Sequence, residues 1–210
     1  MTPNTARRDF LGRLAALGAA VGFLPTHTAA AATASADPAI VAIEDPWMKR
    51  VTGTHKVVFH SHMPTEGLAL RWAQTYLDTQ KTTYGIWEKD CTVIVGLNGR
   101  SIGWFFNDAL WAKYPSIGDV MGMSSARSPM KEAIATLTSR KVILLACANS
   151  IRASGGRFLP AEQRTDRERT TAFGEEARAN LLPGVEVVPA MIVTLQQAQE
   201  RGCRYVYAGG

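Results

Sequence analysis

Residues 141–152, KVILLACANSIR, decide the fold that this sequence predicts. Residues 142–146 are uniformly apolar, without polar alternation, which is typical of a strand buried on both faces of a parallel sheet. Cys147 ends this run, where the strand passes into a loop. In open α/β sheets, ligands and chemistry gather at the carboxyl ends of the strands. The sequence therefore predicts a central buried strand with Cys147 at the functional edge of the sheet.

Three polar residues follow Cys147 and could act on its thiol. Asn149 and Ser150 favour the turn or N-cap that begins a helix, whose first N–H groups would point toward the sulfur and favour a thiolate. Arg152, about one helical turn further on, would add a positive charge. A simpler interpretation stays open, in which Cys147 is a small buried apolar side chain and Arg152 a solvated helix residue.

Segments with the character of strands and helices alternate along most of the chain. Four further apolar runs predict strands, at 57–61, 92–97, 185–188 and 205–208. Helices are expected near 66–79, 102–114, 129–140, 171–182 and 189–201, and a surface loop or lid at 115–128. This alternation predicts βαβ units, so we expect a flavodoxin-like three-layer α/β sandwich with a parallel sheet of about five strands.

The N-terminal residues have the pattern of an export signal. Arg7 and Arg8 precede an apolar stretch at 14–24, and Ala34-Ser35-Ala36 forms a cleavage site. The paired arginines followed by Phe-Leu resemble a twin-arginine motif, with an ordinary secretory signal as the alternative. The apolar stretch is too short to span a bilayer comfortably. We therefore expect a periplasmic protein with a cleaved signal at 1–36, an N-terminal extension at 37–54, an α/β domain at 55–210 and no membrane span in the mature chain.

Charge and cysteine content narrow the possible functions. The chain has 23 Lys and Arg against 18 Asp and Glu, a net charge of +5, and the two signs are interleaved, which argues against nucleic-acid binding. Of the three cysteines, Cys91 and Cys203 each precede a predicted strand. We therefore expect both at the opposite edge of the sheet from Cys147, too far away for a disulfide to it. Motifs for dinucleotides, nucleotide hydrolysis and serine hydrolysis are absent from the sequence.

His60 and His62 form a second candidate site at the carboxyl end of the first predicted strand. Residues two apart on a strand share one face, so both imidazoles could meet one ligand. In the flavodoxin-like strand order this strand would lie next to the strand of Cys147, and two imidazoles with a thiolate suit zinc or copper. The alternative is that both histidines are ordinary polar side chains at a strand end.

Four stretches together resemble the DsrE/DsrF-like family of small α/β proteins: HKVVFHSHMPTEG from residue 55, TVIVGLNGRSIGWFFND from 92, VILLACANSI from 142, and GVEVVPAMIVTLQQAQERGCRYV from 184. Members that move sulfur carry it as a persulfide on a cysteine, and Cys147 matches that position. The resemblance implies a persulfide carrier or sulfurtransferase that works with a sulfur donor or acceptor protein.

Under this interpretation Asn149, Ser150, Arg152 and His62 would bind the substrate around Cys147. The resemblance also implies homo-oligomers, commonly trimers or hexamers. Two other functions stay open at this point. One is a protein that binds a metal or small ligand through His60, His62 and Cys147, and the other is a non-catalytic subunit of an oligomeric assembly.

Overall fold

The computed structural model describes residues 44–209, so the predicted export signal and the first part of the predicted extension lie outside the described residues. In the described part of the chain, five parallel strands form one sheet in the order β4-β3-β2-β1-β5. Their bounds are β1 (His55–Ser61), β2 (Cys91–Leu97), β3 (Ile143–Cys147), β4 (Val185–Val188) and β5 (Arg204–Tyr207). The flavodoxin-like three-layer α/β sandwich is confirmed.

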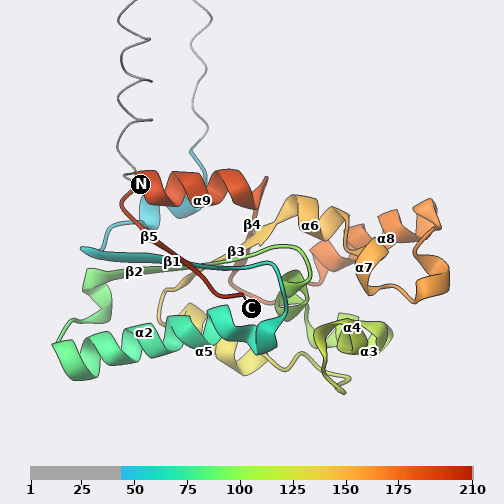
Figure 1. The fold of residues 1–210 in the computed structure, drawn as a ribbon, viewed down its shortest axis with the longest axis horizontal. Coiled ribbons are helices and arrows are strands. Elements are labelled where there is room, and N and C mark those ends of the chain that lie inside the picture. The colour runs from blue at the N-terminus through green and yellow to red at the C-terminus, as the bar shows by residue number, and fades with distance from the viewer. Residues whose placement is uncertain (1–43, 210) are drawn as a thin grey trace, which may run out of the picture. The chain divides into compact units, whose positions relative to one another are not determined.

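Helices cover both faces of the sheet (Figure 1). On one side lie α2 (Leu68–Tyr84) and α5 (Lys131–Ser139), and on the other α9 (Met191–Glu200). Successive side chains of a buried strand point alternately to the two faces of the sheet, and so into the core under α2 and α5 or the core under α9. Val57 and Phe59 of β1 belong to the core on the α2 face, whereas Val58 between them belongs to the core under α9.

The segment before β1 contributes to the core under α9. It contains a short helix, η1 (Pro46–Arg50), whose Trp47 and Met48 are only 1% and 5% exposed. Both side chains belong to the same buried cluster as Val58 of β1 and Ile94 of β2. This part of the predicted N-terminal extension therefore belongs to the folded domain, which begins earlier in the chain than residue 55.

The connection between β2 and β3 is expected to contain two helices, at 102–114 and 129–140, with a loop between them; the second helix is present as α5, and the first part differs. It contains four helices: η4 (Ser101–Phe105), α3 (Asp108–Lys113), α4 (Ser116–Met121) and α5. The helix expected at 102–114 is interrupted because Phe106 pairs with Leu181 in an isolated bridge, and Asn107 Oδ1 then accepts a hydrogen bond from Leu110 N at 3.1 Å to cap α3. The loop or lid expected at 115–128 is partly helical, since α4 occupies its first half.

The connection between β3 and β4 is also mostly helical. It contains α6 (Ala148–Arg152), α7 (Gly155–Phe158), η5 (Ala161–Gln163) and α8 (Arg167–Ala179). The last of these begins earlier than expected because Asp166 Oδ1 accepts hydrogen bonds from Glu168 N at 3.0 Å and Arg169 N at 3.1 Å. Two short helices, η2 (Thr65–Gly67) and η3 (Glu88–Asp90), complete the described elements. None of the helices in residues 44–209 is both long and apolar enough to cross a bilayer.

The strand order places a topological switch between β3 and β4. The chain steps from β1 to β4 in one direction across the sheet, and then returns past three strands to add β5 beside β1. The helices after β3 pack on the α2 face, whereas α9, which follows β4, lies on the other face. In open α/β sheets such a switch is the usual position of a ligand site. The same order corrects one expectation, because β2 separates β1 from β3 and the strand of His60 is not the neighbour of the strand of Cys147.

Candidate functional site

Cys147 lies at the carboxyl end of β3, beside the topological switch. Its side chain belongs to the core under α9 and is 4% exposed. Directly across the strand pair lies Val188, the last residue of β4. The thiol sulfur accepts a hydrogen bond from the backbone N–H of Met191 at 3.4 Å. The sulfur thus sits where β3 ends and α9 begins.

Two features of the sequence bring the start of α9 to this sulfur. Gly96 of β2 has no side chain, and a Cβ there would lie 2.6 Å from the sulfur of Met191, so the glycine lets the helix approach the sheet closely. The N-cap residue, Ala190, has no side chain that can accept a hydrogen bond. Cys147 Sγ therefore partners an N–H of the first turn, where a helix of ten residues concentrates partial positive charge.

The helix that follows Cys147 directly has a different role from the one expected. Cys147 is the N-cap residue of α6, but its side chain makes no capping hydrogen bond there. The N–H at the sulfur belongs instead to α9, whose Met191 lies 44 residues further along the chain. A sequence pattern around residue 147 could not have revealed this contact.

The polar residues of α6 form their hydrogen bonds away from the thiol. Arg152 and Asn149 are both exposed, and the Arg152 guanidinium donates to Asn149 Oδ1. Ser150 is buried, and its hydroxyl oxygen accepts from Gly99 N at 2.9 Å, which ties α6 to the turn after β2. These three side chains therefore do not surround Cys147 in the way that the sequence suggested.

The other two cysteines occupy the opposite edge of the sheet, as expected. Cys91 begins β2 and Cys203 directly precedes β5, and both thiols are free. Burial raises the pKa of each thiol, and at Cys91 the negative charge of Asp90 raises the pKa further. Both therefore favour the neutral thiol.

His60 and His62 belong to a separate group at the carboxyl ends of β1 and β5, which we call the imidazole–phenol cluster. Its members are His60, His62, Asn98, Tyr205 and Tyr207. His60 is buried, with Nδ1 3.0 Å from the Tyr205 hydroxyl and Nε2 3.1 Å from Asn98 Oδ1. Because the amide oxygen can only accept, Nε2 carries the proton and Nδ1 accepts from the phenol. Burial lowers the pKa of His60, against the raising effect of the hydrogen bond to Asn98.

Tyr207 joins the two histidines of this cluster. Its hydroxyl lies 2.6 Å from Nδ1 of the exposed His62, and its ring stacks on that imidazole with centroids 5.5 Å apart. The ring of His60 lies 5.8 Å from the same tyrosine. The two tyrosines were missed in the sequence, although Tyr205 and Tyr207 repeat on the last strand the spacing of two that singled out the histidines on the first.

The expected zinc or copper site shared by His60, His62 and Cys147 is not formed. Neighbouring strands lie about 4.8 Å apart, so β1 and β3 with β2 between them are about 10 Å apart. The thiol is also buried under α9, whereas His62 is exposed beside Tyr207. Within residues 44–209, no group of three or more His, Cys, Asp or Glu side chains could hold a metal ion. The histidines and the thiol are therefore two separate sites.

No family model matches the chain, and no curated protein matches it. A solved protein of unknown function from Methanobacterium thermoautotrophicum is similar, with a TM-score of 0.45 and 18% sequence identity over 73% of this chain and 98% of that chain.

Proposed function

We propose that this protein handles sulfane sulfur, in the manner of the DsrE-like proteins that it resembles, and carries the sulfur as a persulfide on Cys147. One observation carries the proposal, the hydrogen bond from Met191 N–H to Cys147 Sγ at 3.4 Å. A backbone donor at a helix N-terminus stabilises an anionic sulfur. The position beside the topological switch also supports a site of chemistry there.

Loading such a thiol needs a small donor of sulfane sulfur, for which thiosulfate is a suitable probe. The Cys147 thiolate attacks the outer sulfur of thiosulfate, so that a new S–S bond forms at Sγ. The S–S bond of thiosulfate breaks, and sulfite leaves with the electron pair. Thiolate and thiosulfate together carry the same charge as the persulfide and sulfite produced.

Burial of Cys147 limits which donors can load it. With 4% of the residue exposed, a bulky reagent cannot reach the sulfur unless the start of α9 or α6 opens locally. We therefore expect small inorganic donors to load Cys147 in the folded protein faster than a bulky aromatic disulfide reagent modifies the same thiol. Equal rates for both would contradict a buried, selectively loaded thiol.

Intact mass spectrometry under non-reducing conditions tests the proposal directly. Protein treated with thiosulfate or polysulfide should gain the mass of one or more sulfur atoms, and the gain should vanish in Cys147→Ser. Cys91→Ser and Cys203→Ser are matched controls that each remove one thiol at the opposite edge of the sheet. Sulfur loading that persists in Cys147→Ser would refute the assignment.

The proposed setting is the periplasm, with a sulfur donor or acceptor protein as partner and homo-oligomers as the working form. The outer surface of α9 supports a contact between copies, because Ile192 and Val193 are 79% and 51% exposed. Sedimentation analysis of the exported chain measures its oligomeric state, and sequencing its N-terminus locates the cleavage site. In a non-catalytic assembly subunit, Cys147→Ser would leave partner binding and cellular role unchanged.

Binding of a small ligand or metal at the imidazole–phenol cluster is a second candidate function. Two imidazoles and two phenols converge at the carboxyl ends of β1 and β5, and His62, Tyr205 and Tyr207 are exposed. Metal analysis after purification without chelator tests for a bound ion. Stoichiometric metal that disappears in His62→Ala would favour this candidate over sulfur handling.

A further inference from the structure

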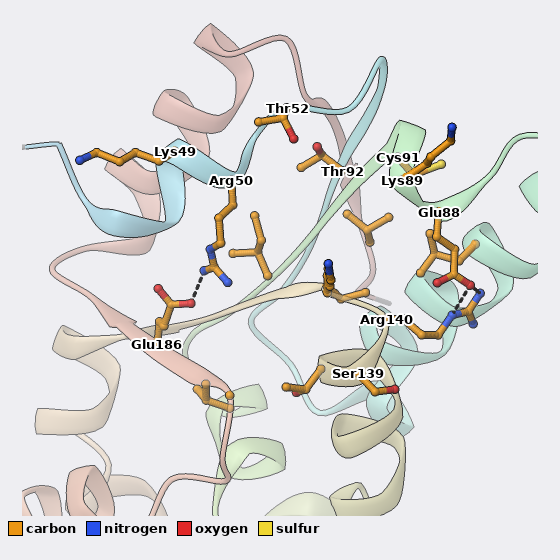
Figure 2. A pocket seen from close by; sticks show the side chains of 18 residues that line it. Lys49, Arg50, Thr52, Glu88, Lys89, Cys91, Thr92, Ser139, Arg140 and Glu186 are labelled. Atoms are coloured by element: carbon orange, nitrogen blue, oxygen red, sulfur yellow. Dashed lines mark hydrogen bonds and ion pairs between the residues drawn. The ribbon is translucent and has the colours of Figure 1, made fainter.

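A large pocket lies at the amino edge of the sheet, at the opposite end of the strands from Cys147. Its volume is about 930 Å³, within the range of pockets that hold small molecules. The walls come from the starts of β2, β3 and β4, together with η1, η3 and the end of α5 (Figure 2). The proposed sulfur chemistry makes no use of this pocket, which therefore raises a separate question of function.

Positive charge exceeds negative charge around this pocket. Five cationic side chains line it against two carboxylates, an excess of three: Lys49, Arg50, Lys89, Arg140 and Lys141 against Glu88 and Glu186. The two guanidinium groups are already paired.

Figure 2 shows Arg50 with Glu186 on one side of the pocket and Arg140 with Glu88 on the other. The three lysines form no ion pair with a carboxylate in residues 44–209. The unbalanced charge therefore resides on ammonium groups.

Lys141 is the most informative of these lysines. It follows α5 with a φ of +61°, in the left-handed region that favours glycine, and its N–H donates to Thr138 O at 3.0 Å. A lysine in this conformation costs stability that glycine would not. Lys49 and Lys89 extend away from the middle of the pocket in Figure 2, so they act on a ligand mainly from the rim. Among the three, the strained and exposed Lys141 is the primary candidate for contact with an anion.

The remaining lining of the pocket is apolar or carries hydroxyl groups. Aliphatic side chains line it between the charged groups: Leu77, Val93, Val142, Ile143 and Val185. The hydroxyls of Thr52 and Thr138 also line the pocket and can donate to an acceptor. A ligand that satisfies all of these groups has an apolar body and an anionic head.

We infer that this pocket binds a small organic anion, in which a phosphate or carboxylate group pairs with Lys141 and an apolar body packs on the aliphatic side chains. A concave site of this size suits a small molecule better than a protein or nucleic-acid surface. The inference is independent of the sulfur proposal, because the two sites lie at opposite edges of the sheet.

Isothermal titration calorimetry with 1-naphthyl phosphate tests the inference on the full chain. We expect binding at one site, and we expect Lys141→Gly to weaken it about tenfold, the usual scale for losing one charged contact. Glycine suits the left-handed backbone of residue 141, so the variant should fold. Lys141→Gln also removes the charge but keeps a longer side chain than glycine, and it should weaken binding by the same factor. Neutral 1-naphthol carries only the apolar body, and inorganic phosphate carries only the anionic group. Each should bind at least tenfold more weakly than 1-naphthyl phosphate.

Two controls separate a specific pocket from general charge attraction. Arg178→Ala on α8 also removes one exposed positive charge, outside the pocket, and should leave binding unchanged. Cys147→Ser should bind 1-naphthyl phosphate normally, and Lys141→Gly should still accept sulfur if the sulfur proposal holds. Absence of binding, unchanged affinity in Lys141→Gly, equal weakening in Arg178→Ala, or equally tight binding of 1-naphthol would each overturn the inference.

Discussion

Replacing Cys147 by alanine and by serine in parallel isolates the contact on which the sulfur proposal depends. Alanine removes both the buried sulfur and the acceptor for Met191 N–H, whereas serine removes the sulfur and retains an acceptor. If the hydrogen bond contributes to the fold, the serine variant should be the more stable of the two. If only apolar packing matters, the buried hydroxyl should make serine the worse replacement.

The expected free energies of unfolding follow from the environment of the sulfur. Loss of one buried sulfur costs about 1 kcal/mol in transfer free energy, by analogy with a buried methylene group. Leaving the N–H of Met191 without a partner adds about 1–3 kcal/mol. We therefore expect Cys147→Ala to lose about 2–4 kcal/mol, and Cys147→Ser about 1–2 kcal/mol, because the hydroxyl is buried but hydrogen-bonded.

Urea unfolding followed by tryptophan fluorescence measures both variants, since Trp47, Trp104 and Trp111 are all buried. Comparable m-values are required for the free energies to be compared. An alanine variant as stable as the serine variant, or more stable, would show that the N–H to sulfur contact contributes nothing. The argument for a stabilised thiolate at Cys147 would then fail.

Three further predictions use the same unfolding assay. Gly99→Ala should lose about 2–3 kcal/mol, because φ is +57° and the new Cβ would lie 2.6 Å from the carbonyl oxygen of His62. Gly85→Ala, with φ +69° but no atom within 4 Å, should lose only about 1 kcal/mol, and an equal loss at both sites would contradict the steric argument. Trp47→Ala should lose about 3–5 kcal/mol, and a loss below about 1 kcal/mol would place the segment before β1 outside the core. Since burial lowers the pKa of His60 from its ordinary 6.5, the unfolded chain takes up a proton that the folded chain does not, so stability should fall as the pH drops below 6.5. His60→Gln should flatten that decline, and an unchanged pH profile would assign it to other groups.

The strands were predictable because burial on both faces leaves a simple pattern in the sequence. The run 185–188 matches β4, and the run 142–146 differs from β3 by one residue at each end. The position of Cys147 at the carboxyl edge followed from that run alone. Local patterns of this kind need no knowledge of the rest of the chain.

Contacts between distant segments set the features that the sequence did not reveal. The break at Phe106 depends on a bridge to Leu181, and the partner of the Cys147 sulfur is the N–H of Met191. The strand order likewise depends on which crossovers the whole chain makes, so the separation of His60 from Cys147 could not be read from their own neighbourhoods. Tertiary packing overrides local propensity at each of these places.

The hydrogen bond between Met191 and Cys147 couples the occupancy of the sulfur to the docking of the last helix. An atom added to Sγ needs space where Met191 N–H now lies 3.4 Å from the sulfur, so loading and close docking of α9 oppose each other. Loading of the sulfur therefore makes the free energy of docking of α9 less favourable, and the same free energy is regained when the sulfur leaves. The amide hydrogens of α9 would therefore exchange faster in the loaded chain than in the unloaded chain. Transfer of the sulfur to an acceptor would be favoured, because it restores the docking of α9.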